Sequence, residues 1–272
     1  MKLENYRTLA TQIREDVLKM TYEKKAGFIG SSFSCADILA VLYGGYVKLN
    51  VNDAEDGSND TVILSKGHAS SAWYAALANI GAIPKERLFS EFHASGGTLG
   101  VHPKRNSAVG IETSTGSLGQ GIGVGCGVAL AHKVQKHSNR VYVILGDGEC
   151  NEGSVWEAFM LAKRYQLNNL VAIVDRNRLQ SYGHDEDVLN MEEMLPRLES
   201  FGWYTLEIDG HNYEEIDEAL QKAMHSDKPT AIIANTIKGK GVSEFEDKVL
   251  WHYKWPEKDH FEKGLKELKE NA

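Results

Sequence analysis

Cysteine is scarce in this 272-residue sequence, which holds only Cys35, Cys126 and Cys150. Their wide separation provides neither the spacing of a cysteine metal site nor the framework of a secreted disulfide protein. Basic residues form no cluster either, and the formal net charge of −8 argues against a general nucleic-acid-binding surface. We therefore expect no nucleic acid among the partners of this chain.

Long apolar runs are also missing. The nearest candidate, residues 116–131, is short and rich in glycine, so we expect no membrane span and no membrane partner. The first residues, MKLENYRTLATQ, lack the apolar core of a signal peptide. These absences lead us to expect a cytoplasmic protein.

What is present is a regular alternation of strand and helix patterns. The composition is 42% hydrophobic and 25% charged, which is ordinary for a globular protein. Apolar runs predict strands at residues 61–64, 141–145, 170–174, 203–208 and 230–236. Helical patterns lie at about 3–25, 35–46, 69–80, 153–163 and 213–225, with a glycine-rich helix from 116 and a charged helix at the end. The alternation predicts a single α/β domain over residues 1–272, with a doubly wound, mostly parallel sheet and helices on both faces.

Three local features carry further expectations. Residues 26–32 are predicted to form a turn, and Ser34 is a candidate N-cap for the second helix. Residues 89–115 form a long segment rich in glycine, histidine and serine, with His93 and His102 as titratable candidates. Such segments inside compact domains are usually functional or disordered, and a solvated loop with incidental histidines is the alternative.

The strongest indication of a site comes from the ends of two predicted strands. Residues 141–145 run into Gly146-Asp147-Gly148, and residues 170–174 lead to Asn177. A crossover connection places two such strands side by side and parallel, so Asp147 and Asn177 should emerge together where open α/β sheets bind ligands. An acid and an amide oxygen suit a hard cation that also holds phosphate oxygens.

Two more turns are expected at the same edge. His68 follows a short strand and begins a helix, where a histidine either packs at the helix end or contacts phosphate. Glycines recur at positions 119, 121, 123, 125 and 127. Because each glycine weakens an isolated helix by about 1 kcal/mol, we expect a close approach there by another backbone or by a flat ligand. The helix should then lie in the core or at a subunit interface.

Familiar nucleotide and hydrolase motifs do not account for these turns. The sequence GDGECNEG does not match the G-x-G-x-x-G of a dinucleotide site, and no Walker phosphate loop or G-x-S-x-G elbow occurs. A phosphate ligand bridged by a cation is the remaining interpretation.

The turns also carry a family resemblance. G-D-G followed by Asn177 resembles the thiamine-diphosphate motif of transketolases and related enzymes. Four further stretches resemble the transketolase cofactor-binding half in the same order: residues 65–69, 100–103, 114–121 and 238–241, the last with His252. The resemblance covers nearly the whole chain and implies the thiamine-diphosphate-binding fold.

The resemblance also implies roles for particular residues. Metal ligands for Mg²⁺ or Ca²⁺ would be Asp147, Asn177 and the carbonyl of Leu179. Residues in contact with the cofactor, or beside its diphosphate, would be His68, Gly116, Leu118, Asp147, Gly148, Asn177 and His252. Candidates for catalytic work would be His68, His102 and His252, with the first two facing the sugar hydroxyls.

Two acids, Glu152 and Glu157, match acids of the family that lie towards a subunit interface. First-turn helix charges favoured by the helix dipole are an equally good explanation of both.

Two departures from the family pattern matter. The first glycine turn of transketolases contains a histidine, and here that position is Phe28, which implies an altered donor sugar or proton handling by His102 and His252. The pyrimidine-binding and C-terminal domains of the family are also missing, so we expect them on a partner chain.

The resemblance therefore implies a split transketolase that moves a two-carbon ketol unit between sugar phosphates. We expect self-association, most simply as α₂β₂, and activity only with the C-terminal subunit. The alternatives are a subunit of a 2-oxoacid dehydrogenase or deoxyxylulose-phosphate synthase, or a scaffold that binds the cofactor without turnover.

Overall fold

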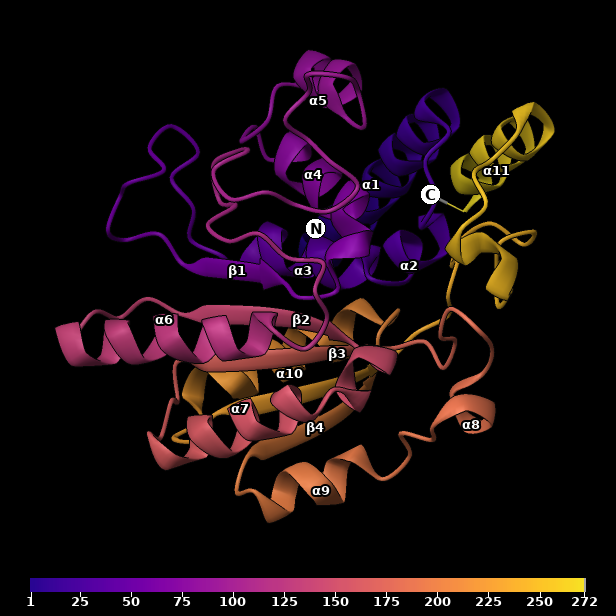
Figure 1. The fold of residues 1–272 in the computed structure, drawn as a ribbon. Helices are drawn as coiled ribbons and strands as arrows, with labels where there is room; N and C mark the ends of the chain where they lie inside the picture. The colour runs from indigo at the N-terminus through magenta and orange to yellow at the C-terminus, as the bar shows by residue number, and fades with distance from the viewer. Residues whose placement is uncertain (272) are drawn as a thin grey trace.

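The computed structural model describes residues 1–271 and shows a five-stranded parallel sheet between layers of helices (Figure 1). Its strands are β1 (Thr61–Leu64), β2 (Val141–Gly146), β3 (Leu170–Arg176), β4 (Tyr204–Asp209) and β5 (Thr230–Asn235). The longer helices are α1 (Lys2–Lys24), α3 (Ala36–Gly45), α4 (Ser70–Asn79), α6 (Gly121–Gln135), α7 (Gly153–Arg164), α10 (Tyr213–His225) and α11 (Lys258–Glu270). The shorter helices are α2 (Ile29–Ser34), α5 (Lys85–Glu91), α8 (Asp185–Val188) and α9 (Met194–Ser200). The predicted fold class is confirmed.

The order of the strands places the predicted site at the carboxyl ends of β2 and β3. The strand order is β1-β2-β3-β5-β4, and each neighbouring pair is parallel. Gly146 at the end of β2 lies opposite Asp175 near the end of β3. The segments that follow these two strands therefore emerge side by side, as the sequence predicts.

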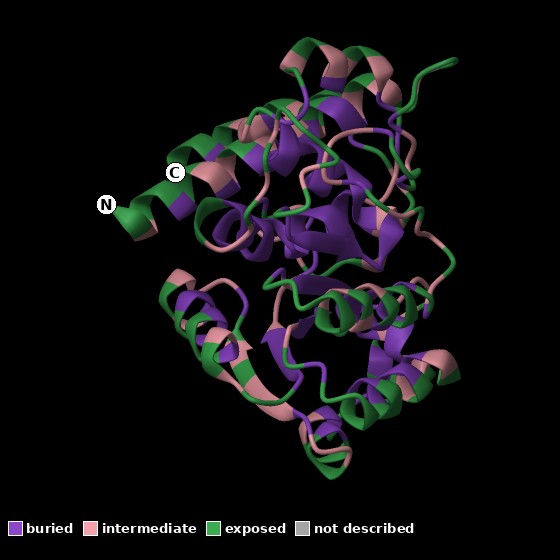
Figure 2. Ribbon diagram, turned by 90° about the vertical axis from the view of Figure 1, so that its left-hand side faces the viewer, coloured by how far each residue is buried: buried purple, intermediate pink, exposed green. Residues whose placement is uncertain are grey.

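Both faces of the sheet are covered. Tyr142 and Ile144 of β2 pack into a core with α1, α3, α4 and α10, whereas Val143 and Leu145 pack into a second core with α6, α7 and α9. Successive side chains of a strand point to opposite faces, so one apolar run supplies both cores. Figure 2 shows the buried residues gathered along the sheet and on the inner sides of the helices.

The first and last helices pack against each other. Phe261 of α11 stacks on Tyr22 of α1 with ring centroids 4.6 Å apart. The side chain of Asn212 caps α10, because it accepts hydrogen bonds from the backbone N–H groups of Glu214 and Glu215.

Four local expectations are wrong. The glycine-rich helix predicted from residue 116 begins only at Gly121. Ser34 does not cap α3, because its hydroxyl donates to the buried carboxylate of Asp175 at 2.6 Å. The turn predicted at 26–32 is shorter, because α2 already begins at Ile29. The irregular segment predicted at 89–115 begins later than expected, because α5 extends to Glu91.

The glycines of α6 lie on two sides of the helix, one packed closely against its neighbours and one exposed. Gly121 and Gly125 face the sheet, where a Cβ on Gly125 would lie 2.5 Å from Cγ2 of Val143 and one on Gly121 would overlap Ser65. Gly123 and Gly127 are exposed, and a Cβ there would meet nothing within 4 Å. The expected close approach therefore holds for one side of the helix, where the strands lie directly beneath it.

Two further expectations can be compared with the described residues. No helix among them combines the length and apolar character needed to cross a membrane. The three cysteines are free and buried.

Candidate functional site

One pocket collects all the residues to which the family resemblance assigns cofactor, metal or catalytic roles, whereas the candidate His93 is exposed and lies outside it. It has a volume of about 300 Å³ and lies where β1, β2 and β3 end. Its lining includes His68, His102, Gly116, Leu118, Asp147, Gly148, Asn177, Leu179 and His252, together with Phe28. Glu152 and Glu157 are exposed on α7 and lie outside this lining.

The carboxylate of Asp147 is held rigidly at the end of β2. Its Oδ1 accepts the N–H of Gly148 at 2.8 Å, and its Oδ2 accepts the N–H of Arg178 at 2.5 Å. Arg178 belongs to the segment after β3, so the acid joins the ends of two strands. Burial raises the pKa of Asp147, which is 3% exposed. A nearby cation would stabilise its ionised form.

Two uncharged oxygen atoms that could bind a metal ion also line the pocket with this acid. The amide oxygen of Asn177 accepts the N–H of Leu179 at 3.1 Å, which fixes the orientation of the amide. The carbonyl of Leu179 accepts from the ammonium of Lys238 at 2.8 Å, so it already faces a positive charge. A carboxylate, an amide oxygen and a carbonyl form the kind of oxygen donor set that Mg²⁺ or Ca²⁺ takes. These residues fit a metal–phosphate ligand.

Three histidines of the pocket lie around Phe28. The ring of Phe28 lies 5.6 Å from His68, 5.7 Å from His102 and 5.4 Å from His252, measured between centroids. Tyr253 packs against the same ring at 5.8 Å. Aromatic rings at such separations make favourable edge and tilted contacts. Phe28 therefore sets the relative positions of the three titratable rings.

The backbone of Phe28 is unusual. Its φ of 68° lies in the left-handed region, which is rare for a bulky side chain. Such a conformation costs about 1–3 kcal/mol and is commonly found at functional sites. It is held by the N–H of Phe28, which donates to the carbonyl of His252 at 2.9 Å. Gly27 allows the close fit, because a Cβ there would lie 2.6 Å from the carbonyl oxygen of Tyr253.

The histidines of the pocket are uncharged near neutral pH. Burial, followed by the positive charges of Lys238 and Lys66, lowers the pKa of His252 to about 3. Burial and Lys66 lower the pKa of His68 well below its ordinary value, and burial lowers that of His102. Each ring can therefore donate through one nitrogen and accept through the other.

Beneath the pocket lies a buried ion pair. The ammonium of Lys66 contacts the carboxylate of Asp175 and also donates to the carbonyl of Ser31 at 3.0 Å. The same carboxylate accepts from the hydroxyls of Ser34 and Thr236. The pair thus joins β3 to α2 and to the segment after β5, and it supports the floor of the pocket.

The sequence alone indicated no role for several lining residues: Ser31, Lys66, Glu149, Gln180, Ser181, Lys238 and Tyr253. Lys66 and Lys238 lie within the stretches that carry the family resemblance, so their motifs were a usable signal. The others come from segments whose path only the fold defines.

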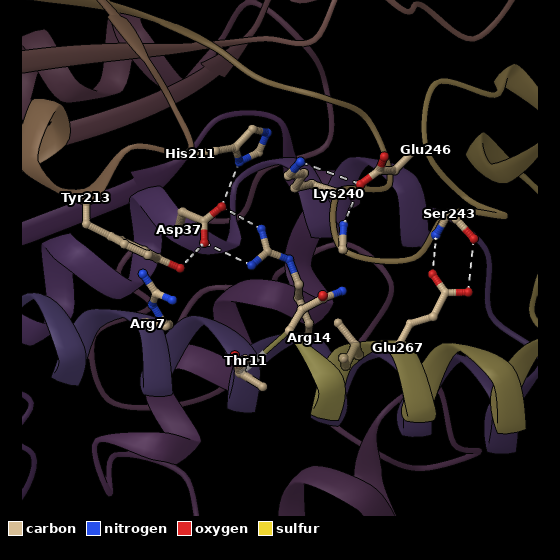
Figure 3. Close-up of a pocket in the computed structure, with 13 residues that line it drawn as sticks. Arg7, Thr11, Arg14, Asp37, His211, Tyr213, Lys240, Ser243, Glu246 and Glu267 are labelled. Carbon is tan, nitrogen blue, oxygen red and sulfur yellow. Dashed lines mark hydrogen bonds and ion pairs between the residues drawn. The ribbon is translucent and has the colours of Figure 1, made fainter.

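A second polar pocket, of about 470 Å³, shares no lining residue with the first (Figure 3). At its centre Asp37 accepts from Arg14, Tyr213 and His211. The charged residues that line it are three cations and three acids: Arg7, Arg14, Lys240, Asp37, Glu246 and Glu267. This balance favours no charged class of ligand, so the first pocket is the better candidate site.

Comparison with known proteins shows the family of the chain. Residues 6–259 match the family model described as "Transketolase, thiamine diphosphate binding domain". The chain belongs to the transketolase family. Its fold also matches the transketolase crystal structure from Campylobacter jejuni with a TM-score of 0.89 and 30% identity, over 98% of this chain and 43% of that one.

Two curated transketolases show how much of the family architecture this chain spans. Human transketolase is 40% identical over 98% of this chain, but the match covers 42% of the human protein. A protein from Phocaeicola vulgatus, named as one subunit of apulose-4-phosphate transketolase, is 37% identical over 99% of this chain and 96% of its own length. The chain is thus similar to the first part of one-chain transketolases and to nearly all of a separate subunit.

Proposed function

We propose that this chain is the cofactor-binding subunit of a two-chain transketolase. Joined to a C-terminal subunit, it would transfer a two-carbon ketol unit from a ketose phosphate to an aldose phosphate. The observation that carries the proposal is the convergence of all the predicted site residues on one pocket. The similarity to a relative that is itself named as a transketolase subunit, over 96% of that relative, supports the two-chain form.

The pocket supports an assignment of residues to the cofactor. Asp147, Asn177 and the carbonyl of Leu179 would hold Mg²⁺ or Ca²⁺ against the diphosphate. Gly148, His68 and His252 would contact the diphosphate or lie beside it, while residues 116 and 118 would meet the aminopyrimidine. Bound thiamine diphosphate supplies the group that takes up and releases the ketol unit.

The need for a second chain follows from the acids of the pocket. Among the described residues, only Asp147 and Glu149 contribute carboxylates to its lining. Both oxygens of Glu149 already accept hydrogen bonds from this chain. A carboxylate that activates the aminopyrimidine would therefore come from the pyrimidine-binding domain, which we expect on a partner chain in an α₂β₂ assembly. Three free, buried cysteines are compatible with a cytoplasmic enzyme.

Neutral histidines support the proposed substrate contacts. His68 and His102 both pack against Phe28 and would bind the hydroxyl groups of a sugar by donating and accepting hydrogen bonds. The side chain of Phe28 can neither donate nor accept a hydrogen bond. We therefore expect the ketose that supplies the ketol unit to differ from ordinary ketose phosphates in the part that lies near this ring.

Reconstitution tests the proposal. This chain and a candidate C-terminal partner are purified separately and assayed for ketol transfer with thiamine diphosphate and Mg²⁺, alone and mixed. We expect turnover only in the mixture. Turnover by this chain alone would refute the two-chain form, and cofactor binding without turnover on any ketose would favour the scaffold.

A further inference from the structure

Glu149 is a buried carboxylate in the cofactor pocket to which the proposed chemistry assigns no task. It follows Asp147 by two residues, in a short helical turn, Gly148–Asn151, and its side chain is 2% exposed. Its Oε1 accepts from the hydroxyl of Ser65 and from the N–H of Gly119 at 2.9 Å. Its Oε2 accepts the N–H of Gly146 at 3.1 Å. All three partners donate, so both oxygens of the carboxylate accept hydrogen bonds within this chain.

The three donors belong to different parts of the site. Ser65 follows β1, Gly146 ends β2, and Gly119 closes the loop that precedes α6. That loop contains Gly116 and Leu118, the residues proposed to meet the aminopyrimidine. One carboxylate therefore connects the loop at one end of the pocket to the turn that carries Asp147 at the other end.

Other contacts also hold this loop, because the hydroxyl of Thr115 donates to the carbonyl of Leu64 at 2.7 Å, but among the hydrogen bonds of the described residues only those of Glu149 join the loop to the end of β2. Gly119 has a φ of 81°, and its carbonyl accepts from the hydroxyl of Ser154 at 3.0 Å. No residue larger than glycine fits at position 121, because a Cβ there would overlap Ser65. The start of α6 thus lies close against Ser65, one of the three donors to Glu149.

The hydrogen-bonding chemistry of Glu149 matters as well as its shape. Three donors point at its two oxygens, so both oxygens must act as acceptors. A glutamine of the same size would direct its NH₂ group at one of these donors. The substitution would then replace a hydrogen bond by a repulsive contact between two donors.

We propose that Glu149 is a positioning residue that fixes the distance between the aminopyrimidine loop and the metal-binding turn. It rests on the proposed function, since it concerns how the same pocket accepts both ends of thiamine diphosphate. The diphosphate end has its own support, because Asp147 is held by Gly148 and Arg178 independently of Glu149. Loss of Glu149 should therefore affect the whole cofactor more than its diphosphate part.

The test compares two ligands on the full chain. Calorimetric titration measures the affinity of wild type and Glu149→Gln for thiamine diphosphate and for inorganic pyrophosphate, each with excess Mg²⁺. We expect Glu149→Gln to weaken thiamine diphosphate binding at least tenfold and pyrophosphate binding less than threefold. Equal losses for both ligands, or no loss, would overturn the inference.

A matched control comes from the second pocket. Asp37 is a carboxylate of similar burial, 2% exposed, with several donors and no place in the cofactor pocket (Figure 3). Asp37→Asn should lower the melting temperature without changing the affinity for thiamine diphosphate. An equal loss of cofactor affinity in Asp37→Asn would show that general destabilisation explains the effect.

Two further outcomes are informative. If Glu149→Gln does not fold, Ser65→Ala decides, because it removes one donor to Oε1 and should weaken thiamine diphosphate binding selectively. Unchanged selectivity in Ser65→Ala would then refute the role. If wild type binds neither ligand, the proposed function itself fails. If wild type binds both ligands and Glu149→Gln binds them equally well, only the role of Glu149 fails.

Discussion

Breaking the buried ion pair beneath the pocket should destabilise the whole chain. Lys66 is 1% exposed and Asp175 is 0% exposed, measured on their side chains. Lys66→Met would leave the carboxylate of Asp175 buried without its cation, although the hydroxyls of Ser34 and Thr236 would still donate to it. Removing one partner of a buried pair typically costs about 3–5 kcal/mol.

This cost corresponds to a large shift in melting temperature. For a chain of this size, 1 kcal/mol changes the melting temperature by about 2–4 °C, so Lys66→Met should lower it by about 6–20 °C. The measurement is thermal or urea unfolding of the chain without cofactor, followed by circular dichroism. Asp175→Asn added to Lys66→Met should recover at least about 2 kcal/mol, because no unpaired charge remains.

An exposed pair provides the control. Lys85 contacts Asp16 with its side chain 40% exposed. Lys85→Met should cost no more than about 1 kcal/mol, since solvent screens such a pair. The reasoning fails if Lys66→Met is as stable as Lys85→Met, or if the double variant is no more stable than Lys66→Met alone.

Three more predictions concern the helix, the second pocket and the donor site. Gly123→Ala should raise the free energy of unfolding of the isolated chain, measured with denaturant, by up to about 1 kcal/mol. Gly125→Ala should lower it by about 1–3 kcal/mol, because the new Cβ would overlap Val143. Equal effects of the two substitutions would contradict the packing of α6. Burial opposes ionisation of Asp37, but Arg14 and His211 outweigh it and hold its pKa well below the ordinary value. The ionised carboxylate of Asp37 therefore stabilises the fold above about pH 4, and this stabilisation is lost progressively as the pH falls further. In wild type the free energy of unfolding should fall between pH 4 and 3, and Asp37→Asn should reduce that slope by up to about 1.4 kcal/mol per pH unit. An unchanged slope would refute this. Phe28→His should shift donor preference in the reconstituted enzyme towards ordinary ketose phosphates, and an unchanged donor profile would contradict the proposed role of Phe28.

The sequence predicts the sheet and the edge at which the pocket lies. Each strand is an apolar run that ends in a polar turn, and parallel pairing brings the carboxyl ends together. The positions of Asp147 and Asn177 follow from this rule alone. The family motifs then add His102 and His252, which no strand end would have indicated.

What the sequence did not predict depends on contacts between distant segments. Ser34 has the residue type of a helix cap, but its hydroxyl donates a hydrogen bond to Asp175, which is more than a hundred positions away in the sequence. Glu149 lies within the G-D-G stretch, yet its role depends on where Ser65 and Gly119 lie in the fold. Such pairings cannot be read from local patterns, because they are created by the packing of the sheet against its neighbouring segments.

The central claim is that Asp147 binds a metal ion that holds the cofactor diphosphate in this chain. Calorimetric titration of thiamine diphosphate into wild type and Asp147→Ala, with and without Mg²⁺, tests it most directly. We expect wild type to bind the cofactor in a Mg²⁺-dependent manner and Asp147→Ala to lose this dependence, because Asp147 is the charged member of the three proposed ligands. Equal, metal-dependent binding by both proteins would contradict the claim.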